Sequence, residues 1–339
     1  MAEDLLESAE DLSRIAFGFM ASKAIFSALH IEIFTYLSEQ PLTVQELSEK
    51  TGVPANRITI LMTALTGIGI VGIDDGRYQN APAAEHFLVR GAKYDFGDYL
   101  RYQIDRQMYP FLQQLNGALD GTLDTESIDS YKSWMADETQ AQLYSESQHS
   151  GSLGPGRTLA RKVDLSKARS LLDVGGGTGA MTISLCNAYP QLESTIIDFP
   201  NVSEIGWRFI SDAGLVNRVR YIPSDALECD WPSEQGAVLM SYLFSGVPGP
   251  SVPNLIANAF AALEPGGIVM VHDFMVEDDR KGPPVAALWQ LQHMAFTPDA
   301  RSIAKGWLAD QLAAEGFVDV RSEEMIPGMT CLVHARKPN

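Results

Sequence analysis

The chain has 339 residues, of which 45% are hydrophobic and 20% charged, with a formal net charge of −18. This length is more than one typical domain needs and suggests two. The acidic surface disfavours two classes of partner, nucleic acid phosphates and anionic membranes, because both would be repelled.

The three cysteines and the N-terminus bear on the compartment. Cys186, Cys229 and Cys331 are widely spaced with no CxxC pair, so we expect reduced thiols in a cytoplasmic protein. The chain begins with the acidic segment "MAEDLLESAEDL", which predicts no signal peptide, and no run approaches the ~20 apolar residues of a membrane span. No His, Asp or Glu cluster has the spacing of metal ligands, so no metal is expected.

Residues 1–90 are helical in pattern and end in a hairpin signal. Thr43 precedes Glu46 by three residues, the spacing of a capping box at a helix start. Gly52 is placed to end that helix and Pro54 to begin the next, and "IVGIDDGRYQN" predicts two strands around an Asp-Gly turn. Three helices followed by a hairpin predict a winged-helix domain.

A winged helix raises the possibility of a DNA-binding regulator, which would be retained on DNA in a salt-dependent way. Residues 41–90 contain four basic and five acidic side chains, and the candidate recognition helix "PANRITILMTALTGIGI" has a single basic residue. Groove reading needs Arg, Lys, Asn or Gln, whereas Ile, Leu and Met make a packing surface. We therefore expect a dimerisation and substrate-lid module.

The remaining chain has two parts. Residues 91–165 form a helical, aromatic-rich segment, interpreted as a linker and substrate lid. Residues 166–339 alternate short apolar runs with helical patterns, which predicts an α/β fold with a Rossmann-like, doubly wound parallel sheet.

The segment "LLDVGGGTGAM" reads as a strand, a glycine loop and a helix start. Gly175, Gly177 and Gly179 permit positive φ and close approach of a ligand to the backbone, and Asp173 at the strand end can meet an ammonium group. A dinucleotide remains an alternative ligand for such a loop, but the absence of a Walker lysine argues against a triphosphate.

With these motifs, the sequence resembles the S-adenosylmethionine-dependent methyltransferases, specifically the two-domain small-molecule O-methyltransferases with a winged-helix dimerisation domain. The resemblance covers nearly the whole chain and is strongest at "LLDVGGGTG", "STIIDFP", "YIPSDALE" and "FAALEPGGIVMVHDF". It implies that S-adenosylmethionine is the cofactor and that the protein is a homodimer. The cofactor-binding residues that it implies are Asp173, Gly175, Gly177, Asp198, which would meet the ribose hydroxyls, Asp225 and Ala226 beside the adenine, and Ser241.

The segment "VLMSYLFSGVPGPSVP" departs from that family. Plant-type members have Leu-His-Asp-Trp here, and the His removes the proton of the substrate hydroxyl. In this chain Ser245 stands at the His position and Gly246 at the Asp position. Three hypotheses remain: a displaced base, for which the candidates are His149, His272 and His293; cofactor binding without methyl transfer; or a nucleophile without a proton, such as a thioether.

A thioether needs alignment rather than a base, and aromatic faces stabilise the sulfonium that forms. The main candidates for positioning the substrate are Tyr144, His149, Tyr242 and Arg101. Arg101 and Arg106 have an alternative, pairing with Asp98 or Asp105. The wider set of candidate lining aromatics is Tyr102, Tyr109, Tyr131, Trp134, Tyr144, Tyr242, Phe244 and Trp289.

By overall pattern and by this departure, the chain also resembles the methylthiohydroxybutyrate S-methyltransferases of dimethylsulfoniopropionate synthesis. The resemblance implies S-methylation of 4-methylthio-2-hydroxybutyrate without a general base. The alternative is an O- or C-methyltransferase of an aromatic or polyketide metabolite that uses a displaced His, such as His149 or His272.

Overall fold

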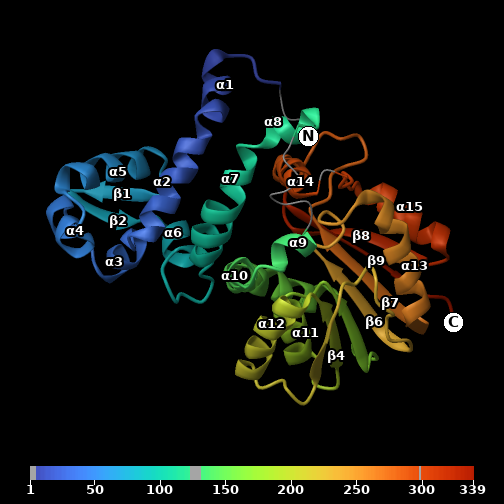
Figure 1. The fold of residues 1–339 in the computed structure, drawn as a ribbon. Helices are drawn as coiled ribbons and strands as arrows, with labels where there is room; N and C mark the ends of the chain where they lie inside the picture. Colours follow the sequence, from blue (N-terminus) through green and yellow to red (C-terminus); the bar gives the residue numbers. More distant parts are fainter. Residues whose placement is uncertain (1–4, 123–130, 298) are drawn as a thin grey trace. The chain divides into compact units, whose positions relative to one another are not determined.

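The structure is a computed structural model that describes residues 5–122, 131–297 and 299–339 (Figure 1). Its internal contacts divide the chain into two compact units, Met1–Gln107 and Met108–Asn339. The division falls within the stretch 91–165 that was interpreted as a helical linker.

The N-terminal unit has the expected order of three helices and a hairpin. Thr43 and Glu46 form a reciprocal capping box at the start of α4, Gly52 ends that helix at φ 71°, and Pro54 precedes α5. Asp75 and Gly76 make the hairpin turn with positive φ. The elements are α1 (Ala9–Ala16), α2 (Gly18–His30), α3 (Ile33–Glu39), α4 (Val44–Thr51), α5 (Ala55–Gly67), β1 (Val71–Asp74), β2 (Arg77–Asn80), α6 (Pro82–Phe87) and the π-helix η1 (Tyr99–Met108).

Helices α1 and α2 present an exposed apolar surface. The stretch Ala9–His30 is long and apolar enough to cross a membrane by length and composition alone, which differs from the expectation from sequence. Only 17% of its most apolar window is buried. An exposed apolar surface of this kind also marks a protein–protein interface. Its large exposed side chains are Leu12, Ile15, Phe17, Phe19 and Met20.

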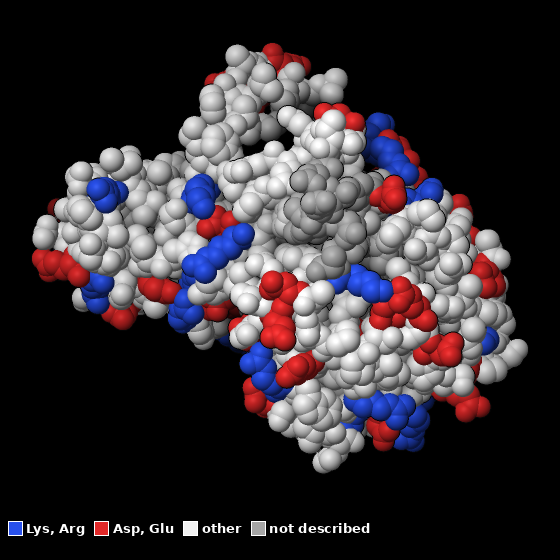
Figure 2. All heavy atoms as spheres, viewed as in Figure 1, with Lys and Arg blue, Asp and Glu red and all other residues white. Residues whose placement is uncertain are grey.

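Charged side chains are mixed in sign on the face drawn in Figure 2, where the basic residues lie scattered among acidic ones. On that face, the described residues of the N-terminal unit form no continuous basic stripe of the kind that follows a nucleic acid backbone.

The C-terminal unit is built on a seven-stranded sheet with the order β5-β4-β3-β6-β7-β9-β8. The central neighbours β3 and β6 mark the point where the strand order reverses, and ligands bind at the carboxyl ends of strands at such a point. The strands are β3 (Ser170–Val174), β4 (Glu193–Asp198), β5 (Val219–Pro223), β6 (Gln235–Ser241), β7 (Leu263–Asp273), β8 (Val318–Ile326) and β9 (Thr330–Arg336).

Helices cover both faces of this sheet, which explains its continuous apolar runs. On β6, Val238 and Met240 pack into one core with α13 and α15, whereas Leu239 packs on the opposite face with α10, α11 and α12. The helices of this unit are α7 (Tyr109–Leu112), α8 (Leu115–Asp120), α9 (Tyr131–Met135), α10 (Glu138–Lys162), α11 (Ala180–Ala188), α12 (Pro200–Asp212), the 3₁₀ turn η2 (Gly249–Ser251), α13 (Val252–Ala262), α14 (Pro284–Phe296) and α15 (Lys305–Glu315).

The doubly wound α/β architecture is confirmed, but the sheet is mixed rather than wholly parallel. Strands β3 to β7 pair in parallel, while β9 pairs antiparallel to both β7 and β8. The reason is the connection: only a short turn joins β8 to β9, and a short turn forms a hairpin, whereas a parallel pair needs a crossover.

A stability prediction follows from two helical glycines. A Cβ at Gly206 would lie 2.1 Å from the Tyr221 hydroxyl, whereas a Cβ at Gly154 would meet nothing within 4 Å. We expect Gly206→Ala to lower the free energy of unfolding by about 1–3 kcal/mol through overpacking. The matched Gly154→Ala change should raise it by roughly 0.5–1 kcal/mol through helix propensity. Denaturant unfolding measures both, and equal effects would contradict the prediction.

Candidate active site

The glycine loop follows β3 and adopts the conformation that its sequence requires. Gly175, Gly177 and Gly179 have φ of 67°, 57° and 75°, in the left-handed region. A Cβ at Gly176 would lie 2.7 Å from the carboxyl carbon of Asp173. Side chains are therefore excluded here, and the backbone is open to close approach by a ligand.

Asp173 supplies a buried carboxylate with an unused oxygen. It is fully buried, and its Oδ2 accepts a hydrogen bond of 2.7 Å from the Thr182 hydroxyl. Its Oδ1 has no hydrogen-bond partner among the described residues. Burial raises the pKa of this carboxyl to about 7. An ammonium group would satisfy the orphaned oxygen and the charge together.

Asp198 ends β4 and braces the glycine loop. Its Oδ2 accepts the Gly177 N–H at 2.7 Å and its Oδ1 accepts the Phe199 N–H at 2.8 Å. Burial raises the pKa of this carboxyl to about 6, against the lowering effect of those two donors. The remaining lone pairs can accept the hydroxyls of a ribose.

Two other predicted cofactor positions hold polar contacts next to the same cavity. Asp225 accepts the Leu227 N–H at 2.9 Å and pairs with the Lys132 ammonium at 3.2 Å. Ser241 contacts Nδ1 of His272 at 2.9 Å through its hydroxyl.

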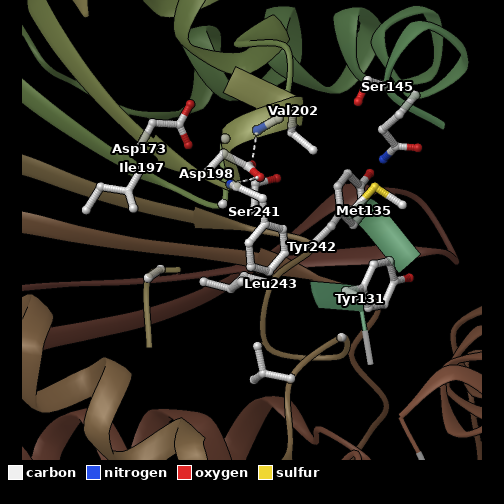
Figure 3. Close-up of a pocket in the computed structure, with 18 of the residues that line it drawn as sticks. Tyr131, Met135, Ser145, Asp173, Ile197, Asp198, Val202, Ser241, Tyr242 and Leu243 are labelled. Atoms are coloured by element: carbon white, nitrogen blue, oxygen red, sulfur yellow. Dashed lines mark hydrogen bonds between the residues drawn. The ribbon is translucent and has the colours of Figure 1, made fainter. Parts of the chain in front are cut away.

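The cavity lies at the carboxyl ends of the central strands and measures about 310 Å³. Figure 3 shows Asp173 and Asp198 on its strand side and Tyr131 and Met135 on the side of α9. All seven predicted cofactor residues line it, namely Asp173, Gly175, Gly177, Asp198, Asp225, Ala226 and Ser241.

Part of the cavity lining is aromatic and apolar. Tyr144 and Tyr242, both predicted to position the substrate, line it together with Tyr131 and Leu243. The rings of Tyr131 and Tyr144 meet edge to face with centroids 6.0 Å apart. Burial raises the pKa of the Tyr144 and Tyr242 hydroxyls, so both stay neutral and neither is a base near neutral pH.

His149 lies behind the cavity rather than on its lining. Its Nδ1 is 2.8 Å from the Thr178 hydroxyl, and its ring stacks on Phe209 with centroids 3.9 Å apart. Burial lowers its pKa to about 4. These contacts assign His149 to the support of the glycine loop, because Thr178 itself lines the cavity.

Arg101 belongs to the N-terminal unit and is not part of the cavity lining. It is buried, its Nε donates to the Leu29 carbonyl at 3.0 Å, and its guanidinium pairs with Asp98 and, at 3.4 Å, with Glu32. Of the two roles that the sequence left open, the structure shows the ion pair. Its charge is already balanced within its own unit.

The end of β6 has no base at the position where the family places one. Ser245 is buried; its hydroxyl donates to Oδ1 of Asp273 at 2.6 Å, and its N–H donates to Oδ2 at 3.0 Å. His272 is fully buried with both ring nitrogens engaged, by Ser241 and by Thr330, each at 2.9 Å. Burial lowers its pKa to about 3. No histidine lies among the described residues that line the cavity.

Two functional positions escaped the sequence analysis. Lys132 is the one cation among the described lining residues, and it joins α9 to Asp225 and Glu228. Asp273 holds Ser245 at the end of the neighbouring strand. The sequence held a signal for Asp273, because it is an Asp at the end of a predicted strand. It held none for Lys132, which is a lone lysine on a short helix.

The glycine loop, the orphaned carboxylate of Asp173 and the second carboxylate at the next strand end fit S-adenosylmethionine, the cofactor of a class of methyltransferases. When bound, this cofactor supplies an electrophilic methyl group on a sulfonium. Asp173 fits its ammonium group and Asp198 its ribose.

Comparison with known proteins agrees with that class. Residues 123–317 match the O-methyltransferase domain and residues 13–90 match the O-methyltransferase dimerisation domain. The chain therefore belongs to the O-methyltransferase family of S-adenosylmethionine-dependent enzymes that act on small molecules.

Individual relatives cover most of the chain. It is 29% identical to the 3-hydroxy-5-methyl-1-naphthoate 3-O-methyltransferase of Streptomyces sahachiroi, over 92% of this chain and 90% of the relative. It is 26% identical to the L-tyrosine C(3)-methyltransferase of Streptomyces lavendulae, over 91% and 86%. The structure of human N-acetylserotonin methyltransferase in complex with S-adenosylmethionine shares the fold, with a TM-score of 0.86, 20% identity and complete coverage of both chains.

The raised pKa of Asp173 predicts how cofactor affinity depends on pH. Only the ionised carboxylate attracts the ammonium, and a pKa of about 7 leaves Asp173 half protonated at neutrality. Affinity should therefore fall several-fold as the pH is lowered from 8 to 6, because the ~tenfold loss of ionised Asp173 is partly offset by fuller protonation of the ligand's α-amino group, whose pKa is about 7.7–8.0. Calorimetric titration with S-adenosylmethionine measures this.

The matched variants for this prediction are Asp173→Asn and Asp212→Asn, the second at an exposed position in α12. Asp173→Asn should bind the cofactor on the order of 10–100-fold more weakly and lose most of the pH dependence. Asp212→Asn should keep both affinity and slope. An unchanged slope in Asp173→Asn would contradict the assignment.

Proposed function

We propose that the enzyme methylates a hydroxyl oxygen or a ring carbon of an aromatic or polyketide-type small molecule. The observation that supports this most is the aromatic, apolar part of the cavity lining beside the cofactor residues. Planar acceptors pack well against tyrosine edges and faces. The activities for which the relatives are named, on a naphthoate and on a tyrosine ring carbon, favour the same class of acceptor.

A second candidate is S-methylation of a thioether acid such as 4-methylthio-2-hydroxybutyrate, the step in dimethylsulfoniopropionate synthesis. One observation favours it: Ser245 replaces the family base, and no histidine lies among the described lining residues. The comparisons favour the aromatic acceptor over this one.

The deciding experiment is mass spectrometry of the purified enzyme with S-adenosylmethionine and separate acceptors. We expect methylated product and S-adenosylhomocysteine from a phenolic set of catechol, 4-nitrocatechol and a hydroxynaphthoate. A sulfonium product from 4-methylthio-2-hydroxybutyrate, with no turnover of the phenols, would overturn the main proposal and establish the second. Heat-denatured enzyme with each acceptor is the control.

We also propose that the enzyme is a cytoplasmic homodimer, joined through its dimerisation domain. The exposed apolar side chains of α1 and α2 support this, because they need a partner surface. Light scattering should give twice the monomer mass for the wild type and less for Ile15→Glu. Val318→Glu, at an exposed apolar position on β8, is the matched control and should leave the mass unchanged. A monomeric wild type would contradict the proposal.

A further inference from the structure

A buried polar cluster lies at the ends of β6 and β7, formed by Asp273, Ser245 and His293. Asp273 is fully buried, and each of its carboxylate oxygens accepts a hydrogen bond from Ser245. The N–H of Phe274 adds a further donor at 2.8 Å to Oδ1. Ser245 is thus fixed in orientation, with its hydroxyl hydrogen pointing to the carboxylate.

That orientation sets the protonation of His293. The Ser245 hydroxyl donates to Asp273, so its oxygen is left to accept, and Nε2 of His293 lies 3.3 Å from it. Nε2 therefore carries the imidazole hydrogen and Nδ1 carries the lone pair. Nδ1 is buried and has no hydrogen-bond partner among the described residues. Burial lowers the pKa of His293 to about 4, which keeps the ring neutral.

His293 lies directly behind one wall of the cavity. The wall is made by Tyr131, Gly246 and Thr297, all of which line the cavity. The ring of Tyr131 is 6.4 Å from that of His293, and Thr297, four residues after His293 in the chain, donates from its hydroxyl to the Gly246 carbonyl at 3.0 Å. His293 thus neighbours residues of the cavity wall without lining the cavity itself.

We propose that His293 is the proton acceptor for methylation of a hydroxyl, acting through one water that bridges the wall, with Ser245 and Asp273 as its positioning residues. This rests on the proposed oxygen acceptor. The hydroxyl proton moves to Nδ1 as the oxygen lone pair forms a bond to the methyl carbon. The methyl–sulfur bond breaks with its electron pair left on sulfur, and the imidazolium later releases its proton to solvent.

The cluster suits this role chemically. An imidazolium formed at His293 would donate from Nε2 to Ser245, whose own hydrogen bond ends on the Asp273 carboxylate. Positive charge on the ring is thereby coupled to a buried negative group, so the two stabilise each other when the proton arrives. Ser245 stands at the position of the family's base, and in this proposal it orients the base, His293, through a hydrogen bond.

The test compares two phenols that differ in acidity. His293→Gln keeps an amide donor toward Ser245 but lacks a basic nitrogen. For catechol, which is protonated at neutral pH, we expect kcat/KM to fall by about 10²-fold or more. For 4-nitrocatechol, which ionises near neutrality, the loss should stay under about tenfold. Equal losses for both phenols, or none, would overturn the proposal.

Two further variants test the positioning role of Ser245 and the specificity of the effect for His293. Ser245→Ala removes the link to Asp273 and should give a smaller loss with the same dependence on acceptor acidity. His86→Asn changes an exposed histidine on α6 and should leave both rates unchanged. Cofactor affinity, measured by calorimetry, should be the same in all three variants and the wild type.

A second readout requires no turnover. Long-range ¹H–¹⁵N spectra of the imidazoles, assigned with His293→Gln, should show His293 with Nε2 protonated and Nδ1 bare. The opposite tautomer would overturn the proposal. If the wild type methylates only the thioether, the proposed oxygen acceptor fails, and the proton-accepting role of His293 fails with it, because a thioether has no proton to lose. If the wild type methylates the phenols but His293→Gln loses the same factor on both, only the role of His293 fails.

Discussion

Several carboxylates lie at the carboxyl edge of the parallel sheet, and a buried carboxylate needs hydrogen-bond donors or a cation as partners. Asp173, Asp198, Asp225 and Asp273 lie at or just after the ends of β3, β4, β5 and β7. A buried charge without donors is costly, so the loops that follow these strands are shaped around the carboxylates. Asp198 is met by loop amides and Asp273 by Ser245, whereas Asp173 keeps one oxygen without a described partner. The oxygen without a described partner makes Asp173 the carboxylate that fits an ammonium group, whereas Asp198 keeps lone pairs for hydroxyls.

The features that the sequence predicts well are those that one segment determines by itself. The capping box of Thr43 and Glu46 and the left-handed Gly52 need only their own neighbours, and both are found as expected. The alternation of apolar runs and helices likewise follows from burial on both faces of the sheet. The direction of β9 was missed, because it depends on which strand lies beside it rather than on its own side chains.

The same distinction holds within the site. The predicted cofactor residues follow strand ends, where the topology brings them together, and all of them line the cavity. The rest of the lining comes from α9, α10, the loop after β6 and Thr297 at the end of α14, so a residue's place depends on tertiary packing. Tyr144 and Tyr242 line the cavity, whereas Arg101 pairs with Asp98 and His149 contacts Thr178. Lys132 finds Asp225 across 93 positions in the sequence, a pairing that no local pattern encodes.

With serine in place of the family's histidine, the segment after β6 cannot itself accept a proton, but it can still position another residue. A serine hydroxyl is too weakly basic to take a phenol's proton, yet it both donates and accepts. Placed between Asp273 at the end of β7 and His293 on α14, it couples the carboxylate to the imidazole through two hydrogen bonds. The chemistry demanded of that imidazole depends on the acceptor: a phenol must lose a proton, whereas a thioether has none to lose and leaves its charge on sulfur beside the tyrosines. The acceptor atom thus decides whether this cluster takes part in the reaction or only supports the wall.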